Sequence, residues 1–250
     1  TVSNKPGING YTSQPATVLL LDTKNTDPVF QPWMVAQAAR LLSYLGSGQQ
    51  LAVYQLRSDG LHQLHAFSAN ARHLLGAFAP ATISRTSTGY KLDLSHVGII
   101  DKQTQEELER EVQDITLRKR RQEETAHALA ELGLFLREIP GRKNILWMSG
   151  DFLPLFDVKG DSSETKAIDA AARALDAANV ALFPTDVRGH VVPETPQDIA
   201  HGEEATIPAD RRKLLPPNYH DVMKTIASST GGAAIFNKAQ LAESMVDNVS

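Results

Sequence analysis

The sequence predicts a doubly wound α/β domain, in which a mostly parallel sheet with one antiparallel edge strand carries helices on both faces. Three observations support this fold class. Short apolar runs alternate along the chain with segments of helical periodicity, the order typical of β–α–β units. The runs are continuously apolar, as expected of strands that are buried on both faces. With 250 residues, the chain can bury a large core without a disulfide, and it contains no cysteine.

The first part of the chain contains two strands, a helix between them and an edge hairpin. The first strand ends in Asp22, and the turn Ser58-Asp-Gly60 joins the second strand to the edge strand. The helix carries its apolar residues on one side and ends at Gly46 and Gly48. In chain order, we expect a strand at 17–22, a helix at 33–45, a strand at 51–56, the edge strand at 61–67, a short helix at 70–78 and a polar loop at 80–101.

The segment 103–139 has helical periodicity almost throughout. Its first half is highly charged, and its second half carries an apolar stripe that includes Leu129, Leu132 and Leu136. If unbroken, this helix would be about 55 Å long at 1.5 Å per residue, which is longer than such a sheet requires. We therefore expect its first half to project from the domain or to bend back as a separate helix.

The rest of the chain continues the alternation around one long loop. In chain order, we expect a strand at 144–149, a helix at 163–179, a strand at 180–183, a Pro-rich rim loop at 186–218, a helix at 219–230, a strand at 233–236 and a helix at 239–249. Residues 1–15 are polar and rich in Gly, Asn, Ser and Pro, which indicates a flexible linker. We expect residues 16–250 to form one domain, and the abrupt ends of the chain suggest a fragment of a longer protein.

Composition and motif content exclude several classes of function. The absence of cysteine excludes thiolate catalysis and cysteine-based zinc sites. The net charge of -4 gives no global field that attracts nucleic acid, and the basic run 118–121 lies among glutamates, as on a solvated helix face. No apolar run reaches the roughly 18 residues of a membrane span. The sequence also lacks a serine-hydrolase elbow and a phosphate-binding glycine loop. We therefore expect neither a nucleic-acid partner nor a transmembrane segment.

Polar side chains follow three of the predicted strands. The stretch 22–26 follows the first strand, 149–151 follows the 144–149 strand, and Asp186 and Arg188 follow the 180–183 strand. Ligands of open parallel sheets bind at the carboxyl ends of the strands, and carboxylates with nearby hydroxyls suit a hard divalent cation. Two plainer interpretations remain open. Asp22 could fix the turn that follows it, and Asp186 with Arg188 could form an exposed ion pair worth about 1 kcal/mol at most.

Three segments together resemble a von Willebrand factor A domain, and more narrowly the divergent branch of that family described from acidobacteria. They are the stretch 22–26, the segment Gly141-Arg-Lys-Asn-Ile-Leu-Trp-Met-Ser-Gly150 and the segment Ala181-Leu-Phe-Pro-Thr-Asp-Val-Arg-Gly189. The closing Ser229-Thr-Gly-Gly232 is similar as well, and the resemblance covers roughly residues 16–250. It implies a Rossmann-like sheet with a metal-ion-dependent adhesion site, where Mg²⁺ or Mn²⁺ recruits an acidic residue of a partner protein.

Compared with the family's Asp-x-Ser-x-Ser loop, this site is degenerate. Asp22 and Thr26 match the first and last positions, but Lys24 replaces the first serine, and Asp151 comes one place after the family's second aspartate. The resemblance thus implies Asp22, Thr26 and Asp151 as an incomplete set of metal ligands. Because an ammonium group repels a divalent cation, we hypothesise that Lys24 is a built-in cation beside Asp22. The predicted partner-binding rim consists of Lys24, Asn25, Asp186 and Arg188.

The resemblance implies a non-catalytic module of the protein-binding or adhesion type, with another protein as its partner and Mg²⁺ or another divalent cation as the candidate cofactor. It also implies a bacterial protein that is exported to the periplasm, the cell surface or the medium. Two alternatives remain. One is a hydrolase of the haloacid-dehalogenase type with Asp22 as nucleophile, in which Lys24 stands where that class needs a second carboxylic acid. The other is a purely structural scaffold domain.

Overall fold

A five-stranded sheet lies at the centre of the structure, a computed structural model that describes residues 16–28, 30–44, 49–76, 78, 102–151, 163–188, 220–236, 238 and 240–249. The strands are β1 (Ala16–Asp22), β2 (Leu51–Arg57), β3 (Gly60–Ser68), β4 (Lys143–Ser149) and β5 (Val180–Asp186). They lie in the order β3-β2-β1-β4-β5. All neighbours pair in parallel except β3, which runs antiparallel to β2 at one edge. The predicted doubly wound sheet is confirmed.

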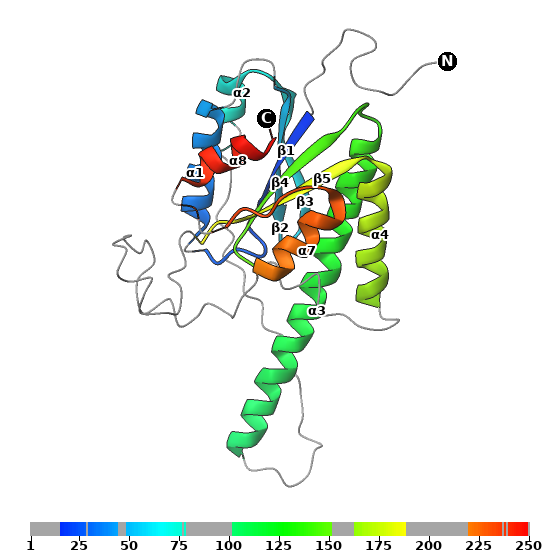
Figure 1. Ribbon diagram of the computed structural model, residues 1–250. Coiled ribbons are helices and arrows are strands. Elements are labelled where there is room, and N and C mark those ends of the chain that lie inside the picture. The colour runs from blue at the N-terminus through cyan, green and yellow to red at the C-terminus, as the bar shows by residue number, and fades with distance from the viewer. Residues whose placement is uncertain are drawn as a thin grey trace.

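Helices cover both faces of this sheet (Figure 1). The helices on one face are α1 (Gln31–Tyr44), α2 (Ala71–Gly76) and α8 (Leu241–Val249). The helices on the other face are α3 (Lys102–Arg137), α4 (Ser163–Ala177) and α7 (His220–Thr230). Among the described helices, none is both long and apolar enough to cross a membrane.

The central strand β1 contributes to the core on both of its faces. Successive side chains of a strand point to opposite faces, so Leu19 and Leu21 pack with α1 and α8, while Val18 and Leu20 pack with α3 and α4. This explains why the sequence of β1 is continuously apolar rather than alternating. It also fixes the register that places Asp22 at the carboxyl end of the central strand.

The long helix α3 is a single unbroken element of 36 residues, about 54 Å long at 1.5 Å per residue. Its second half packs closely on α4, because Gly133 lets the two backbones approach. A Cβ at position 133 would lie 2.8 Å from the carbonyl carbon of Ala174. The first half extends well beyond the sheet (Figure 1). The predicted projection is confirmed, and the alternative of a separate, folded-back helix is wrong.

The end of α7 is fixed by two glycines. Gly231 has a φ of 71°, and the amide of Gly232 donates to the carbonyl of Ala227 at 2.9 Å, as in a glycine-terminated helix. Gly232 also lies against β5, because a Cβ there would lie 1.8 Å from the Leu182 carbonyl oxygen. Gly231 and Gly232 therefore form a glycine cap at the end of α7. The predicted strand at 233–236 is reduced to one parallel bridge between Thr185 and Ile235.

Several predicted segments lie outside the described residues. They are the linker at 1–15, the polar loop at 80–101 and the rim loop from 189 to 218.

Candidate functional site

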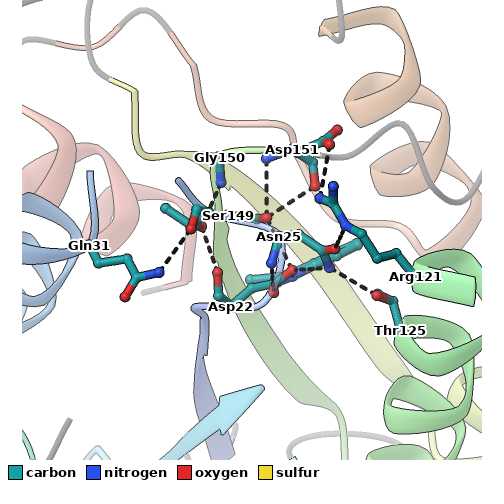
Figure 2. A network of polar contacts seen from close by, with 10 residues as sticks. Asp22, Asn25, Gln31, Arg121, Thr125, Ser149, Gly150 and Asp151 are labelled. Atoms are coloured by element: carbon teal, nitrogen blue, oxygen red, sulfur yellow. Dashed lines mark hydrogen bonds and ion pairs between the residues drawn. The ribbon is translucent and has the colours of Figure 1, made fainter. Parts of the chain in front are cut away.

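The predicted site lies at the carboxyl end of the sheet, where the segments that follow β1 and β4 meet the middle of α3 (Figure 2). The turn after β1 supplies residues 22–26, the end of β4 supplies residues 149–151, and α3 supplies Arg121 and Thr125. Most of these side chains are buried. The site is therefore a network of internal polar contacts.

The carboxylate of Asp22 is fully buried and accepts four hydrogen bonds. Its Oδ1 accepts from the backbone amide of Asn25 at 2.9 Å. Its Oδ2 accepts from Asn25 Nδ2 at 2.9 Å, Trp147 Nε1 at 3.0 Å and Ser149 Oγ at 3.0 Å. Burial raises the pKa of Asp22, and these hydrogen bonds oppose the rise. Both oxygens of the carboxylate thus face donor groups of the protein itself.

Thr26 holds the turn after β1 against β4. Its hydroxyl donates to the Asp22 carbonyl at 2.5 Å and accepts from the Gly150 amide at 2.9 Å. The side-chain amide of Gln31 closes the turn from the other side by donating to the carbonyls of Thr23 and Thr26, both at 2.9 Å. These contacts agree with the plainer interpretation, in which the polar residues after β1 fix a turn.

The side-chain amide of Asn25 joins Asp22 to α3. Its Nδ2 donates to Asp22 and also to Thr125 Oγ1 at 2.9 Å. Its Oδ1 accepts from Arg121 Nε at 3.0 Å. Arg121 Nη2 in turn donates to Asp151 Oδ2 at 3.1 Å. A continuous chain of polar contacts therefore runs from the central strand through α3 to the residues after β4.

The structure pairs Lys24 with α3 and not with the Asp22 carboxylate. Its ammonium group pairs with Glu124 of α3, and its side chain is only 7% exposed. Although burial opposes it, pairing with Lys24 and Arg120 holds the pKa of Glu124 below its ordinary value. None of the described contacts joins Lys24 to the Asp22 carboxylate, so the structure gives no support to the hypothesis of a built-in cation at Lys24. The cation that is linked to Asp22, through Asn25, is Arg121.

Sequence reasoning missed Arg121 and the role of Trp147. The basic run that contains Arg121 has the pattern of a solvated helix face, and the apolar run that contains Trp147 predicts only a buried strand. A signal for Arg121 does exist. It lies four positions before Thr125, so the two side chains share a face of α3 with the apolar stripe that packs on the sheet. The polar part of that face therefore had to meet the polar rim.

The residues predicted as metal ligands do not fit a divalent cation. The Asp22 oxygens face N–H and O–H donors, the Thr26 hydroxyl is engaged on both sides, and Asp151 pairs with a guanidinium. A cation at this place would have to displace several hydrogen bonds and lie beside Arg121. The described part of the chain also holds no group of three or more His, Asp or Glu that could bind a metal.

Asp186 and Arg188 form a buried pair, and not the exposed ion pair that was one interpretation of their sequence. Arg188 Nε donates to Oδ1 at 2.9 Å and Nη2 donates to Oδ2 at 2.6 Å, and the two side chains are 6% and 0% exposed. His220 Nε2 lies 3.5 Å from the same carboxylate. Although burial opposes it, these groups hold the pKa of Asp186 below its ordinary value. The pair fixes the segment after β5 from inside the domain.

The four residues predicted as a partner-binding rim all have internal partners in the structure. Asn25, Asp186 and Arg188 are buried, and Lys24 is covered by its contact with Glu124. Their role in partner binding stays a prediction.

No family model and no curated protein matches the chain. Several solved structures are similar to it in fold at 10–11% identity. An aerotolerance-related membrane protein from Bacteroides fragilis NCTC 9343 has a TM-score of 0.49, with 94% of this chain and 98% of that chain covered. The conserved hypothetical protein BatB from Bacteroides thetaiotaomicron has a TM-score of 0.46, with 94% and 97% covered. The SpRpn10 VWA domain has a TM-score of 0.28, with 68% and 88% covered.

The sheet itself agrees with the architecture that the sequence resemblance implies. The strand order β3-β2-β1-β4-β5, the antiparallel edge strand and the helices on both faces are all present. Asp22 ends the central strand at the carboxyl edge, where this architecture places its ligands. The fold is von Willebrand factor A-like. Within this von Willebrand factor A-like domain, the position of the metal site holds a hydrogen-bonded network that includes Arg121.

Proposed function

We propose that this von Willebrand factor A-like domain is a non-catalytic protein-interaction module that works without a divalent metal. Its partner contacts would lie on the projecting part of α3 and on the exposed surface where α3 meets the carboxyl rim. The observation that carries the proposal is the state of Asp22. Its carboxylate is fully buried and holds four internal hydrogen bonds, so it is available neither to a metal nor to a substrate.

The hydrolase alternative has less support from the same residues. A nucleophilic aspartate must reach its substrate, but Asp22 has no exposed surface. The second carboxylic acid of that chemistry is replaced by Lys24, whose ammonium group is paired with Glu124. An exported, adhesion-type role in a bacterium is part of the proposal and rests on the sequence resemblance.

Site-specific photo-crosslinking tests the interaction proposal. A crosslinking amino acid at Arg120, on the exposed side of α3, would be compared with one at Ser43, which is exposed on α1 at the opposite face. We expect a discrete adduct from the Arg120 position in cells of the source organism, unchanged by EDTA, and none from Ser43. Equal labelling at both positions, or none at either, would favour the scaffold alternative.

An activity assay tests the hydrolase alternative separately. Purified protein would be incubated with p-nitrophenyl phosphate, with and without Mg²⁺, beside the Asp22→Asn variant. Turnover that needs Mg²⁺ and disappears in the variant would contradict a non-catalytic role.

A further inference from the structure

Helix α3 is fastened to the rim at one short stretch, and the fastening lies where the helix leaves the sheet. Three residues within five positions contact the rim, namely Arg121, Glu124 and Thr125. After this stretch, the second half of α3 packs on the sheet and α4. Before it, the helix extends away from the domain (Figure 1). These three residues therefore lie at the base of the projecting part.

The contacts of this stretch connect α3 to the segments that follow two different strands. Arg121 reaches Asn25 after β1 and Asp151 after β4, so its guanidinium bridges two neighbouring strands of the sheet (Figure 2). Thr125 lies one turn further and accepts from the same Asn25 amide. Because a guanidinium is planar and presents its donors in a fixed fork, it fixes an orientation as well as a distance. Its two contacts therefore constrain the orientation of α3 more than a single contact would.

Burial makes these contacts costly to break. The side chain of Lys24 is almost fully covered, and Glu124 is the acidic partner of its ammonium group. Asn25 and Thr125 are buried as well. A buried polar group that loses its partner keeps its desolvation cost, so partial release of α3 is unfavourable. The buried contacts therefore favour the arrangement in which α3 is held against the rim.

We propose that Arg121 and its partners form a metal-independent latch that sets the direction in which α3 leaves the domain. The guanidinium of Arg121 supplies the positive charge at the rim, in the place where a divalent cation does not fit. Arg121 is a positioning residue, since it acts through the orientation of the helix. The inference deepens the proposed function, on which its biological meaning rests, by naming the element whose orientation the rim controls.

Distance measurements between two spin labels test the latch. The chain has no native cysteine, so Gln105→Cys near the start of α3 and Arg173→Cys on α4 would be its only labelling sites. We expect a narrow distance distribution for the otherwise unchanged protein. Arg121→Ala should broaden or displace that distribution.

Two further variants make the result specific. Arg137→Ala is the control, because Arg137 is an exposed arginine of the same helix that lies 16 positions after Arg121, and it should leave the distribution narrow. Arg121→Lys keeps the charge but loses the fork, so it should shift the distribution in the same sense as Arg121→Ala. It also serves if the alanine variant does not fold. A distribution that stays as narrow in both Arg121 variants as in the parent protein would overturn the latch.

Addition of Mg²⁺ or Ca²⁺ completes the test. Neither ion should change the distance distribution of the parent protein. Saturable narrowing or displacement by Mg²⁺ that is lost in Asp22→Asn would show a metal-controlled rim and overturn the proposal. The experiment needs no partner, so its failure and the failure of the crosslinking experiment are separate results.

Discussion

Asn25 and Arg121 lie 96 positions apart in the chain, yet the Asn25 amide oxygen accepts from Arg121 Nε at 3.0 Å. Through its nitrogen, the same amide donates to the buried carboxylate of Asp22. Asn25 therefore connects a buried anion of the central strand to a half-exposed cation of α3. A polarised amide in this position satisfies both groups without bringing them into direct contact.

Removal of the Asn25 side chain should destabilise the domain more than a typical surface change. Asn25→Ala deletes the amide that contacts Asp22, Thr125 and Arg121, and we expect a loss of about 2–4 kcal/mol in the free energy of unfolding. Urea denaturation measures this loss. Asn248→Ala, which removes an exposed contact within α8, is the control and should cost less than about 0.5 kcal/mol. Similar losses in both variants would contradict the central role of Asn25.

Gly232 should tolerate no side chain. A Cβ there would lie 1.8 Å from the Leu182 carbonyl oxygen, so Gly232→Ala must displace β5 or the end of α7. We expect a loss of about 3 kcal/mol or more, or failure to fold. Gly76→Ala is the matched control, because nothing lies within 4 Å of its Cβ position and α2 is helical there. Thermal unfolding of the two variants should therefore differ clearly, and equal melting temperatures would show that the contact at Leu182 relaxes freely.

The stability of the domain should depend strongly on both partners of the Asp186–Arg188 pair. Arg188→Leu leaves a buried carboxylate without its main partner, and we expect a loss of about 3–5 kcal/mol. The double variant Asp186→Asn/Arg188→Leu should recover much of that loss, because no charge remains buried. A double-mutant cycle by urea denaturation at neutral pH measures the coupling. Additive effects of Asp186→Asn and Arg188→Leu on the free energy of unfolding would show that the two groups do not interact.

Protonation of Asp22 should increase the stability of the folded domain at mildly acidic pH. Because the folded pKa of Asp22 is raised above 3.8, the folded state binds this proton at a higher pH than the unfolded chain does. The contribution is fully present below the unfolded pKa and is lost as the pH rises through the folded pKa. Asp186 and Glu124 act in the opposite sense, because their pKa values are lowered.

A comparison with Asp22→Asn isolates this contribution, since the variant shares the other carboxylates. We expect the stability of the parent protein, relative to that of the variant, to fall as the pH rises from about 4 to about 7. Urea denaturation across this range provides the difference. A difference that rises with pH instead would mean that the hydrogen bonds to Asp22 outweigh its burial.

Restoring the family serine should not restore a metal site. Lys24→Ser removes the ammonium group, but Arg121, the Asn25 amide and the engaged Thr26 hydroxyl remain. We expect no saturable heat on titration with up to about 10 mM Mg²⁺ and no rise in melting temperature, which bound metal would cause. The parent protein is the control. Tight Mg²⁺ binding by Lys24→Ser would instead support the hypothesis that Lys24 takes the place of a metal ion.

Local patterns predicted most of the architecture. The buried strand around Leu19, the hairpin at Gly60 and the glycine cap at Gly231 each follow from spacing or turn chemistry within a few residues. The length of α3 predicted that its first half would either project or fold back as a separate helix, and length alone does not distinguish these two arrangements. The weak point was the last strand, because a single bridge at Ile235 has the same apolar sequence as a paired strand.

The contacts of the site were less accessible to sequence reasoning. The positions of Asp22, Thr26 and Asp151 at the carboxyl edge follow from the strand order, but their partners do not. Arg121 and Trp147 come from distant segments. Helical spacing places Arg121 on the face of α3 that carries the apolar stripe, but it does not identify the rim groups that Arg121 contacts. The pairing of Lys24 with Glu124 is equally non-local.

The unbroken geometry of α3 converts a small rotation at the rim into a large movement at its tip. From residue 121 back to residue 102, the helix spans about 28 Å at 1.5 Å per residue. A tilt of about 10° at Arg121 would therefore carry the tip through about 5 Å, close to one helical turn. The projecting part of α3 would therefore move as one rigid arm, which pivots where the helix contacts the turn after β1.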